Sequence, residues 1–440
     1  MKHFNYNRAD IRAGIVHFGV GNFHRAHLEA YTNRLLENPA QQMWGVFGAM
    51  IMPGDGALYG ALKQDDGIYR LTTCSASGDR SDELIGSLVG LAWGELDPEP
   101  IIARIASEDT RIITLTITEG GYKVDPEQPR SVFWYVAEGL KRRMERNLPV
   151  TILSCDNLQH NGDTAREAFM TYFRAKYPAV AAWAETHTTF PNSMVDRITP
   201  ATRSGKLTDV CCEDFIQWVV EDRFIAGRPA WEQVGVTFTD DVTPYETMKL
   251  SLLNASHSLL SYPAYLEGFR QVDSAVLDAR YRRLLELFMD RDVTPYVPTP
   301  AGVDLASYKK RLIERFSNGA ISDQIARLCG DGLAKLAVYV VPTLVQLLAD
   351  GKDTAIEAFL IASYWKYLVG ARTEAGEAID RFEPHATETD RQLMEGCSPH
   401  DFLAISPLYG LHLAQQRAFV EQYDWFCAHS IAEGLTKILN

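Results

Sequence analysis

The 440-residue sequence has no block rich in lysine or arginine, and its 57 acidic side chains outnumber 43 basic ones, which leaves a net charge of −14. A surface of that sign repels the phosphates of nucleic acids and the headgroups of anionic membranes. The composition therefore argues against DNA, RNA and membrane-surface partners.

The chain also has little that would direct it to or through a membrane. Its first ten residues, MKHFNYNRAD, contain no apolar core of signal-peptide type. The longest mostly apolar run, Leu333 to Ala349, is interrupted by Lys335 and Pro342. It is also shorter than the ~20 residues of a membrane span. We therefore expect a cytoplasmic protein in which this run forms buried core helices.

Cysteines are few and scattered: there are seven, and no C-x-x-C pair. This excludes a disulfide framework and a cysteine zinc cage as expectations. His24 and His27, with His17 nearby, have a spacing that can hold a metal, but no carboxylate or cysteine stands at ligand spacing. Packing or capping roles are therefore favoured, and a metal-dependent hydrolase built on these histidines stays a distant alternative.

The first half of the chain alternates between strand-like and helical segments. Apolar runs that suit strands covered on both faces are Gly14–Phe18, Trp44–Ile51, Ile112–Ile117 and Val150–Leu153. A helical pattern from about His24 to Leu36 follows the first run. Such alternation predicts an α/β domain of doubly wound, Rossmann type with a parallel sheet.

After about Asp241 the pattern changes to long amphipathic stretches with few strand-like runs. These stretches cover 246–262, 304–329, 333–350, 353–371 and 410–436. We therefore expect an α/β domain over residues 1–240 and a mainly helical domain over residues 241–440. The cleft between two such domains is a common place for a small-molecule site.

A glycine turn, Gly19-Val20-Gly21-Asn22-Phe23-His24, follows the first predicted strand and opens the first predicted helix. Two glycines in that position allow backbone N–H groups to approach a pyrophosphate, although His24 replaces the third glycine of the usual motif. Asp55, after the second strand, stands where an acid would hold the ribose hydroxyls and favour NAD over NADP. The alternatives are an ordinary strand-to-helix turn and a solvated turn aspartate.

The segment from Thr243 to Leu260 is the most informative. Thr243, Pro244 and Glu246 mark the start of a helix. At ~100° per residue, Lys249, His257 and Asn254 fall at about 0°, 80° and 140°, on one side.

A lysine shielded among leucines should have a lowered pKa, which suits a general base. An asparagine beside it can stabilise an oxyanion, and a histidine can orient a hydroxyl. The competing interpretation is a lysine that reaches solvent while Asn254 and His257 satisfy backbone groups.

Polar residues at predicted strand ends favour the catalytic interpretation, because ligands bind at the carboxyl ends of strands in open α/β sheets. Glu119, in Thr-Glu-Gly-Gly-Tyr, can pass protons, and Asn157, in Cys-Asp-Asn, can be a second oxyanion donor. Asp196 lies in the further polar segment 192–200. Ordinary turn chemistry is the alternative for each.

Together these segments resemble the polyol-specific long-chain dehydrogenase/reductase family, which includes mannitol 2-dehydrogenase, D-arabinitol dehydrogenase and the hexuronate reductases. The resemblance spans most of the chain, and the lysine segment and the glycine turn are its specific parts. The matching segments are Gly19–His27, Thr116–Tyr122, Ser154–Asn157, Asn192–Pro200, Lys249–His257 and Ile325–Leu328.

The resemblance implies roles for these residues. Lys249 would be the general acid/base, Asn157 and Asn254 the oxyanion-stabilising pair, and His257 a holder of the reactive hydroxyl. Glu119 would lie in the proton path to solvent. Asp196 would line the site near the nicotinamide, and Arg327 and Lys335 would contact substrate hydroxyls. The turn from Gly19 to His24, together with Asp55, would bind NAD; no metal would be needed, and the protein would be a monomer.

The sequence thus predicts an NAD-dependent oxidoreductase that reversibly oxidises a secondary alcohol of a straight-chain polyol, of mannitol, arabinitol or sorbitol type, to the ketose. A hexuronate reductase of the same family, acting on a sugar acid, is the nearest alternative. An NAD-binding protein without catalysis is a further one, which the intact set of Lys249, Asn254 and His257 argues against.

Overall fold

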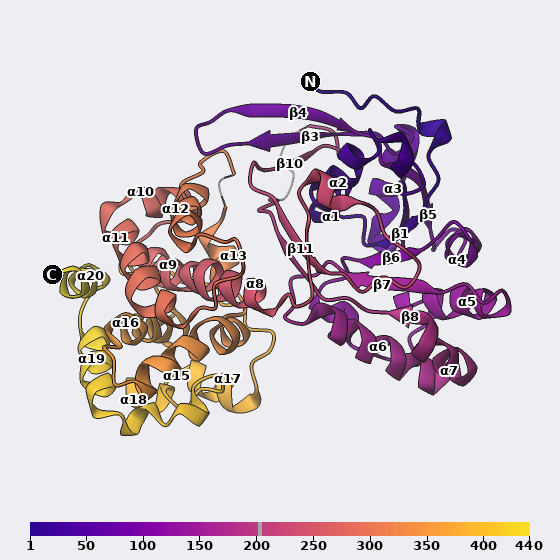
Figure 1. The fold of residues 1–440 in the computed structure, drawn as a ribbon. Coiled ribbons are helices and arrows are strands. Elements are labelled where there is room, and N and C mark those ends of the chain that lie inside the picture. Colours follow the sequence, from indigo (N-terminus) through magenta and orange to yellow (C-terminus); the bar gives the residue numbers. More distant parts are fainter. Residues whose placement is uncertain (201–204, 322) are drawn as a thin grey trace. The chain divides into compact units, whose positions relative to one another are not determined.

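The computed structural model describes residues 1–200, 205–321 and 323–440. These residues form two compact units, Met1–Thr243 and Pro244–Asn440 (Figure 1). The division lies close to the change of sequence pattern expected near residue 240. Each unit has its own hydrophobic core.

The first unit is built on a six-stranded sheet in which every pair of neighbouring strands is parallel. This confirms the doubly wound α/β fold, and the four predicted apolar runs all form strands of it. In sheet order the strands are β5 (Leu88–Trp93), β2 (Val46–Met50), β1 (Ile15–Phe18), β6 (Ile112–Leu115), β7 (Val150–Ser154) and β8 (Thr188–Thr189).

Alternate side chains of the sheet pack into two separate hydrophobic cores, one on each face. Val16 and Phe18 of β1 pack on one face against the helices α4 (Glu99–Ala106), α5 (Val132–Glu145), α6 (Asn161–Lys176) and α7 (Pro178–His187). Ile15 packs on the other face with α1 (Asn22–Ala26), α2 (Leu28–Leu35) and α3 (Gly56–Gln64).

Two small three-stranded sheets complete this second face. The first has the order β10 (Val210–Glu213), β3 (Tyr69–Cys74) and β4 (Arg80–Ile85). The second has the order β12 (Thr237–Thr239), β11 (Gln217–Glu221) and β9 (Ser193–Asp196).

One expected element is wrong in detail. The single helix predicted from about His24 to Leu36 is two helices, α1 and α2, because the backbone leaves the helical region at His27, with φ −111° and ψ −84°. The buried His27 ring bonds through Nε2 to the carbonyl of Gln217, 2.9 Å away, and packs edge-on to Trp218. These contacts with a distant strand fix the break.

The second unit is helical, as expected, but several predicted stretches are interrupted. The stretch 304–329 is split into α12 and α13, and 410–436 contains the gap before α20. The helices are α8 (Thr243–Met248), α9 (Ala255–Leu266), α10 (Val272–Leu277), α11 (Ala279–Leu287), α12 (Leu305–Phe316), α13 (Ile325–Cys329), α14 (Gly332–Lys335), α15 (Val341–Ala349), α16 (Ala355–Trp365), α17 (Glu388–Glu395), α18 (Pro399–Phe402), α19 (Arg417–Ala428) and α20 (Ile431–Leu439).

Three of the predicted stretches contain π-helical turns, at Lys249–Asn254, Leu336–Val340 and Lys366–Gly370. The run Gly332–Ala349 is, among the described residues, the one helix long and apolar enough to cross a membrane. That criterion is weak, because core helices of globular proteins also meet it.

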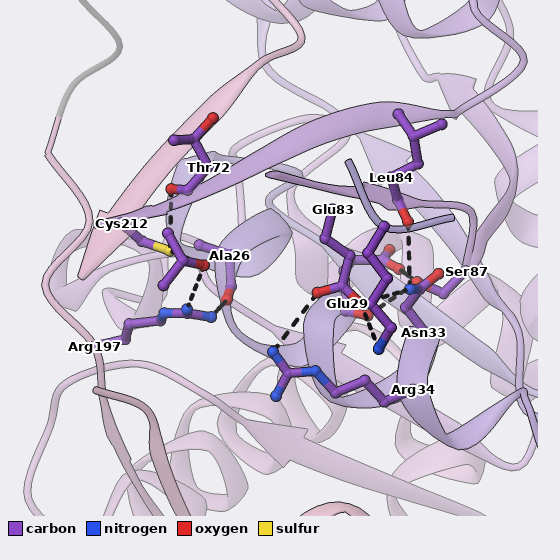
Figure 2. A network of polar contacts seen from close by, with 12 residues as sticks. Ala26, Glu29, Asn33, Arg34, Thr72, Glu83, Leu84, Ser87, Arg197 and Cys212 are labelled. Carbon is purple, nitrogen blue, oxygen red and sulfur yellow. Dashed lines mark hydrogen bonds and ion pairs between the residues drawn. The ribbon is translucent and has the colours of Figure 1, made fainter. Parts of the chain in front are cut away.

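A cluster of polar side chains is buried between α1, α2 and the sheet. The rings of His17 and His24 are stacked, with centroids 3.4 Å apart, and His24 Nε2 lies 3.4 Å from Glu29 Oε1. Ser87 donates a hydrogen bond to Glu29, and Figure 2 shows these two side chains together. Burial lowers the pKa of His17 to about 3 and raises the pKa of Glu29 to about 8. Both groups are therefore uncharged near neutral pH.

The shifted pKa of Glu29 predicts how stability depends on pH. The folded protein keeps a proton on Glu29 that the unfolded chain releases near pH 4.3, so its contribution to stability falls as pH rises from about 4.3 to about 8. Glu29→Gln imitates the protonated acid and should equal the wild type at pH 4. It should gain stability above pH 8, on the order of a few kcal/mol.

Thermal unfolding midpoints of the two proteins between pH 4 and pH 9 test this expectation. Glu145→Gln, at an exposed position of α5, is the matched control and should follow the wild type. Parallel curves for the wild type and Glu29→Gln would contradict the buried, protonated state of this carboxyl.

Candidate functional site

The turn after β1 requires glycine at its first position. Gly19 has a φ of +95°, and a Cβ there would overlap the backbone carbonyl of Thr116. Gly21 differs, since its φ is −89° and a Cβ there would lie 3.9 Å from the carbonyl oxygen of Gly19, with nothing else near. Within the described residues no contact demands glycine at 21. The space beside the first N–H groups of α1 is left open, as a pyrophosphate needs.

Two buried arginines hold α1 under this turn. Arg25 donates to the carbonyls of Gly21 and Thr208, at 3.3 and 2.6 Å. Arg197 donates to the carbonyl of Ala26, a contact drawn in Figure 2, and to that of Glu213; the first bond is 2.5 Å long. Sequence reasoning did not single out either arginine. The available signals were the positions of Arg25 within the glycine-turn motif and of Arg197 within the segment Asn192–Pro200.

The side chains of the remaining residues of the predicted cofactor turn contact other parts of the protein. Val20 is buried, and the half-buried ring of Phe23 stacks on His27 at 4.9 Å. Asn22 Oδ1 accepts a hydrogen bond from Arg25 at 2.7 Å. The His24 ring is fully buried on His17. At these positions a cofactor would therefore meet the backbone, with the side chains supporting the turn.

The three N-terminal histidines pack rather than converge on one point. His17 bonds to Thr114 and Thr116, and His27 bonds to the Gln217 carbonyl. Over residues 1–200, 205–321 and 323–440, no group of three or more His, Cys, Asp and Glu side chains is arranged to hold a metal ion. The alternative of a histidine-based metal hydrolase gains no support from this geometry.

The register of the sheet places several predicted site residues at one edge. Ala49, Phe18, Leu115 and Ser154 are successive partners across β2, β1, β6 and β7. The segments that follow them therefore leave the sheet at the same level. They carry the half-buried Asp55, the glycine turn, and the exposed Glu119 and Asn157.

Asp55 lies at this edge in a short helical turn, Pro53–Asp55, after β2. Its Oδ2 accepts a hydrogen bond from the backbone N–H of Met52 at 2.9 Å. This bond holds the carboxylate beside the end of β2. Asp196 is the last residue of β9 and is buried.

Asp156 is a functional candidate that the sequence analysis missed. Its carboxylate accepts hydrogen bonds from the N–H groups of Ile117 and Thr118, at 3.0 and 2.8 Å, and from the Tyr122 hydroxyl at 2.7 Å. Thr118 has a φ of +61°, so these bonds hold an unfavourable backbone conformation next to Glu119. The available signal was its place between Cys155 and Asn157 at a strand end.

In the second unit the lysine segment departs from the predicted α-helical geometry. Residues Lys249–Asn254 form a π-helical turn between α8 and α9. Hydrogen bonds from i to i+5 bring residues five apart, such as Lys249 and Asn254, closer to one side than the 140° of an α-helix. Lys249 is 6% exposed, and Asn254 Oδ1 is buried without a hydrogen-bond partner. Buried polar atoms of this kind are uncommon, and a catalytic role is one explanation for them.

His257 follows on α9 and is also buried. Its ring lies against Phe316 of α12, with centroids 4.5 Å apart. Asp323 interacts with it electrostatically and forms two bonds to Arg327, from Nε at 2.9 Å and Nη2 at 2.5 Å. Asp323 was not predicted from the sequence, although its position four residues before Arg327 is the spacing of a helical ion pair.

Lys335 has a different environment from that expected for a substrate contact. Its ammonium group donates to the carbonyls of Leu328 and Gly330, at 2.9 and 2.5 Å, and lies 3.4 Å from that of Arg327. Burial, together with the charge of Arg327, lowers its pKa. The three donors of the ammonium are thus directed at the end of α13, and a substrate hydroxyl would have to displace one of these carbonyls.

Comparison with known families gives a consistent result over nearly the whole chain. Residues 13–233 match the mannitol dehydrogenase Rossmann domain, and residues 241–425 match the mannitol dehydrogenase C-terminal domain.

Individual relatives agree with this result. A polyol:NADP oxidoreductase of Gluconobacter oxydans is 38% identical over 88% of this chain and 86% of its own length. Mannitol 2-dehydrogenase of Phaeosphaeria nodorum is 34% identical over 95% of this chain and 79% of its own length.

Solved structures show the same fold. Pseudomonas fluorescens mannitol 2-dehydrogenase, in a ternary complex with NAD and D-mannitol, is 35% identical with a TM-score of 0.87, covering 100% of this chain and 96% of the other. A substrate-free D-sorbitol dehydrogenase is 33% identical with a TM-score of 0.91, covering 100% and 97%.

Proposed function

Because this chain belongs to the mannitol dehydrogenase family, and is therefore an oxidoreductase, we propose that it is an NAD-dependent polyol dehydrogenase. It would reversibly oxidise a secondary alcohol of a straight-chain polyol to the ketose. The observation that carries the proposal is the buried Lys249 in a π-helical turn that also bears Asn254, with His257 on the helix that follows.

The proposed chemistry assigns one task to each polar group of this segment. Lys249, which is buried, accepts the proton of the substrate hydroxyl. His257 holds that hydroxyl. The side-chain amides of Asn254 and Asn157 donate to the oxygen as negative charge develops on it. Glu119, which is exposed, passes the proton to solvent.

For the cofactor, we propose that the backbone of Gly19–Asn22 binds the pyrophosphate and that Asp55 binds the ribose, with Asp196 near the nicotinamide. The open space at Gly21 fits this role. NAD, when bound, supplies the hydride acceptor. The carboxylate of Asp55 would repel a 2′-phosphate, which favours NAD even though one relative is named for NADP.

The substrate side of the proposal rests on Arg327, with Lys335 supporting the segment that carries it. A hexuronate reductase is not favoured, for two reasons. The similar proteins are named for mannitol, sorbitol and polyols. Both cations that a substrate carboxylate would use are also already engaged, Arg327 by Asp323 and Lys335 by carbonyls.

A panel of substrates tests the proposal directly. With NAD, the absorbance of the reduced cofactor should rise on addition of D-mannitol, D-arabinitol or D-sorbitol, and should rise less with NADP. D-mannonate and D-altronate should give little or no rate. Turnover of the sugar acids alone would indicate a uronate reductase. Inactivity on every polyol, despite NADH binding, would mean that this chain has the fold of the family but not the proposed chemistry.

Replacement of Lys249 tests the assignment of the base. Lys249→Ala should lower turnover by roughly 10²- to 10⁴-fold, because a general base contributes that much, and should leave NAD binding nearly unchanged. Lys310→Ala, at an exposed lysine of α12, is the control and should keep full activity. Steady-state kinetics and cofactor titration measure both quantities. Unchanged turnover in Lys249→Ala would end the proposal for this residue.

The two glycines of the turn give a matched pair for cofactor binding. Gly21→Ala should fold normally yet bind NADH at least about tenfold more weakly, because its methyl group would enter the proposed pyrophosphate space. Gly19→Ala should instead lower the unfolding temperature, because of the clash with Thr116 and the strained φ. NADH fluorescence titration and thermal unfolding separate the two effects. Full NADH affinity in Gly21→Ala would place the cofactor elsewhere.

A further inference from the structure

The most informative contact outside the proposed catalytic segment is the pair formed by Asp323 and Arg327. The carboxylate of Asp323 faces the guanidinium with both oxygens, at 2.9 and 2.5 Å. The Asp323 side chain is 11% exposed, whereas that of Arg327 is 62% exposed. The buried anion thus holds a cation whose outer surface faces open space.

The backbone around Asp323 is fixed independently of this pair. The Asp323 carbonyl accepts a hydrogen bond from Val272, the N–H of Ile325 donates to Arg270, and Gln324 pairs with Gln271 in an isolated antiparallel bridge. The carboxylate is therefore set in position before any ligand binds. Arg327, on a long and flexible side chain, takes its orientation from the carboxylate.

Asp323 is ionised in this setting. Burial acts to raise its pKa, but the hydrogen bonds and charge of Arg327, together with His257, outweigh burial and hold the pKa below its ordinary value. The net charge of the pair is therefore close to zero. A neutral hydroxyl can still accept a hydrogen bond from the guanidinium, whereas a carboxylate ligand would also meet the negative charge of Asp323.

We propose that Asp323 is a specificity-determining residue that orients Arg327 and cancels its charge, so that the site selects neutral polyols over sugar acids. This inference rests on the proposed function, because it takes Arg327 as a contact to substrate hydroxyls. It adds a reason, within this chain, for a site that contains a cation to discriminate against an anionic substrate. Asp323 would act through Arg327 and His257 and would not touch the reacting atoms.

The test compares a polyol with its aldonate, which differs by one carboxylate, in the wild type and in Asp323→Asn. With D-mannitol as substrate and D-mannonate as competitive inhibitor, the variant should show a KM for mannitol raised several-fold. Its inhibition constant for mannonate should fall by roughly tenfold, since the guanidinium is left without its anion. The kcat should change less than either constant. A purely structural role would weaken both ligands together.

Two further variants keep the test decisive. Asp331→Asn, on the same segment but paired with His385, is the control and should leave the mannonate-to-mannitol ratio unchanged. If Asp323→Asn fails to fold, Asp323→Ser replaces it, because the serine hydroxyl can still accept from the N–H of Gln324, as Asp323 does. If the wild type oxidises polyols and Asp323→Asn leaves the mannonate-to-mannitol ratio unchanged, the inference about Asp323 is overturned and the proposed function stands. A wild type inactive on polyols would overturn the proposed function and the inference with it.

Discussion

The arrangement of the first unit depends on the register of four parallel strands. Phe18, Ala49, Leu115 and Ser154 are partners across the sheet, so the segments that follow them begin at one level although they are far apart in the sequence. A slip of one residue would exchange the faces that Val16 and Ile15 present to their two cores. Apolar packing thus sets the positions of the glycine turn, Glu119 and Asn157.

Under the turn, the protein uses buried polar groups that carry little unpaired charge. His17 and Glu29 are neutral because burial shifts their pKa values, and Arg25 and Arg197 are compensated by backbone carbonyls. Such groups are costly to bury unless their hydrogen bonds are made. The bonds from Arg25 and Arg197 to backbone carbonyls hold α1 in one position, which suits a turn whose N–H groups must meet a ligand without rearranging.

Local patterns in the sequence were sufficient to predict four strands of the six-stranded sheet, the place of the glycine turn and the helical nature of the lysine segment, but not the other strands or the π-helical turn. Apolar runs, paired glycines and helix-start residues act over a few positions, and so they can be read from a single chain. The break at His27, the support from Asp156 and the pairing of Asp323 could not be predicted in this way. The first depends on Gln217, 190 residues away, and the second on Thr118, 38 residues away. The third has the right spacing, but spacing alone does not distinguish it from a solvated ion pair.

The π-helical turn at Lys249 is one of several in the second unit. Such turns are rare and often lie at functional sites, yet the second unit contains others, at Phe288–Val293, Leu336–Val340 and Lys366–Gly370. The turn by itself therefore does not identify a site. Among the π-helical turns of the residues that the structure describes, only the one at Lys249 combines a buried amine with an amide oxygen left without a partner. An α-helix would turn Asn254 about 140° away from Lys249. The π-helical turn brings the two side chains closer to one side, which is the arrangement that the proposed roles of Lys249 and Asn254 require.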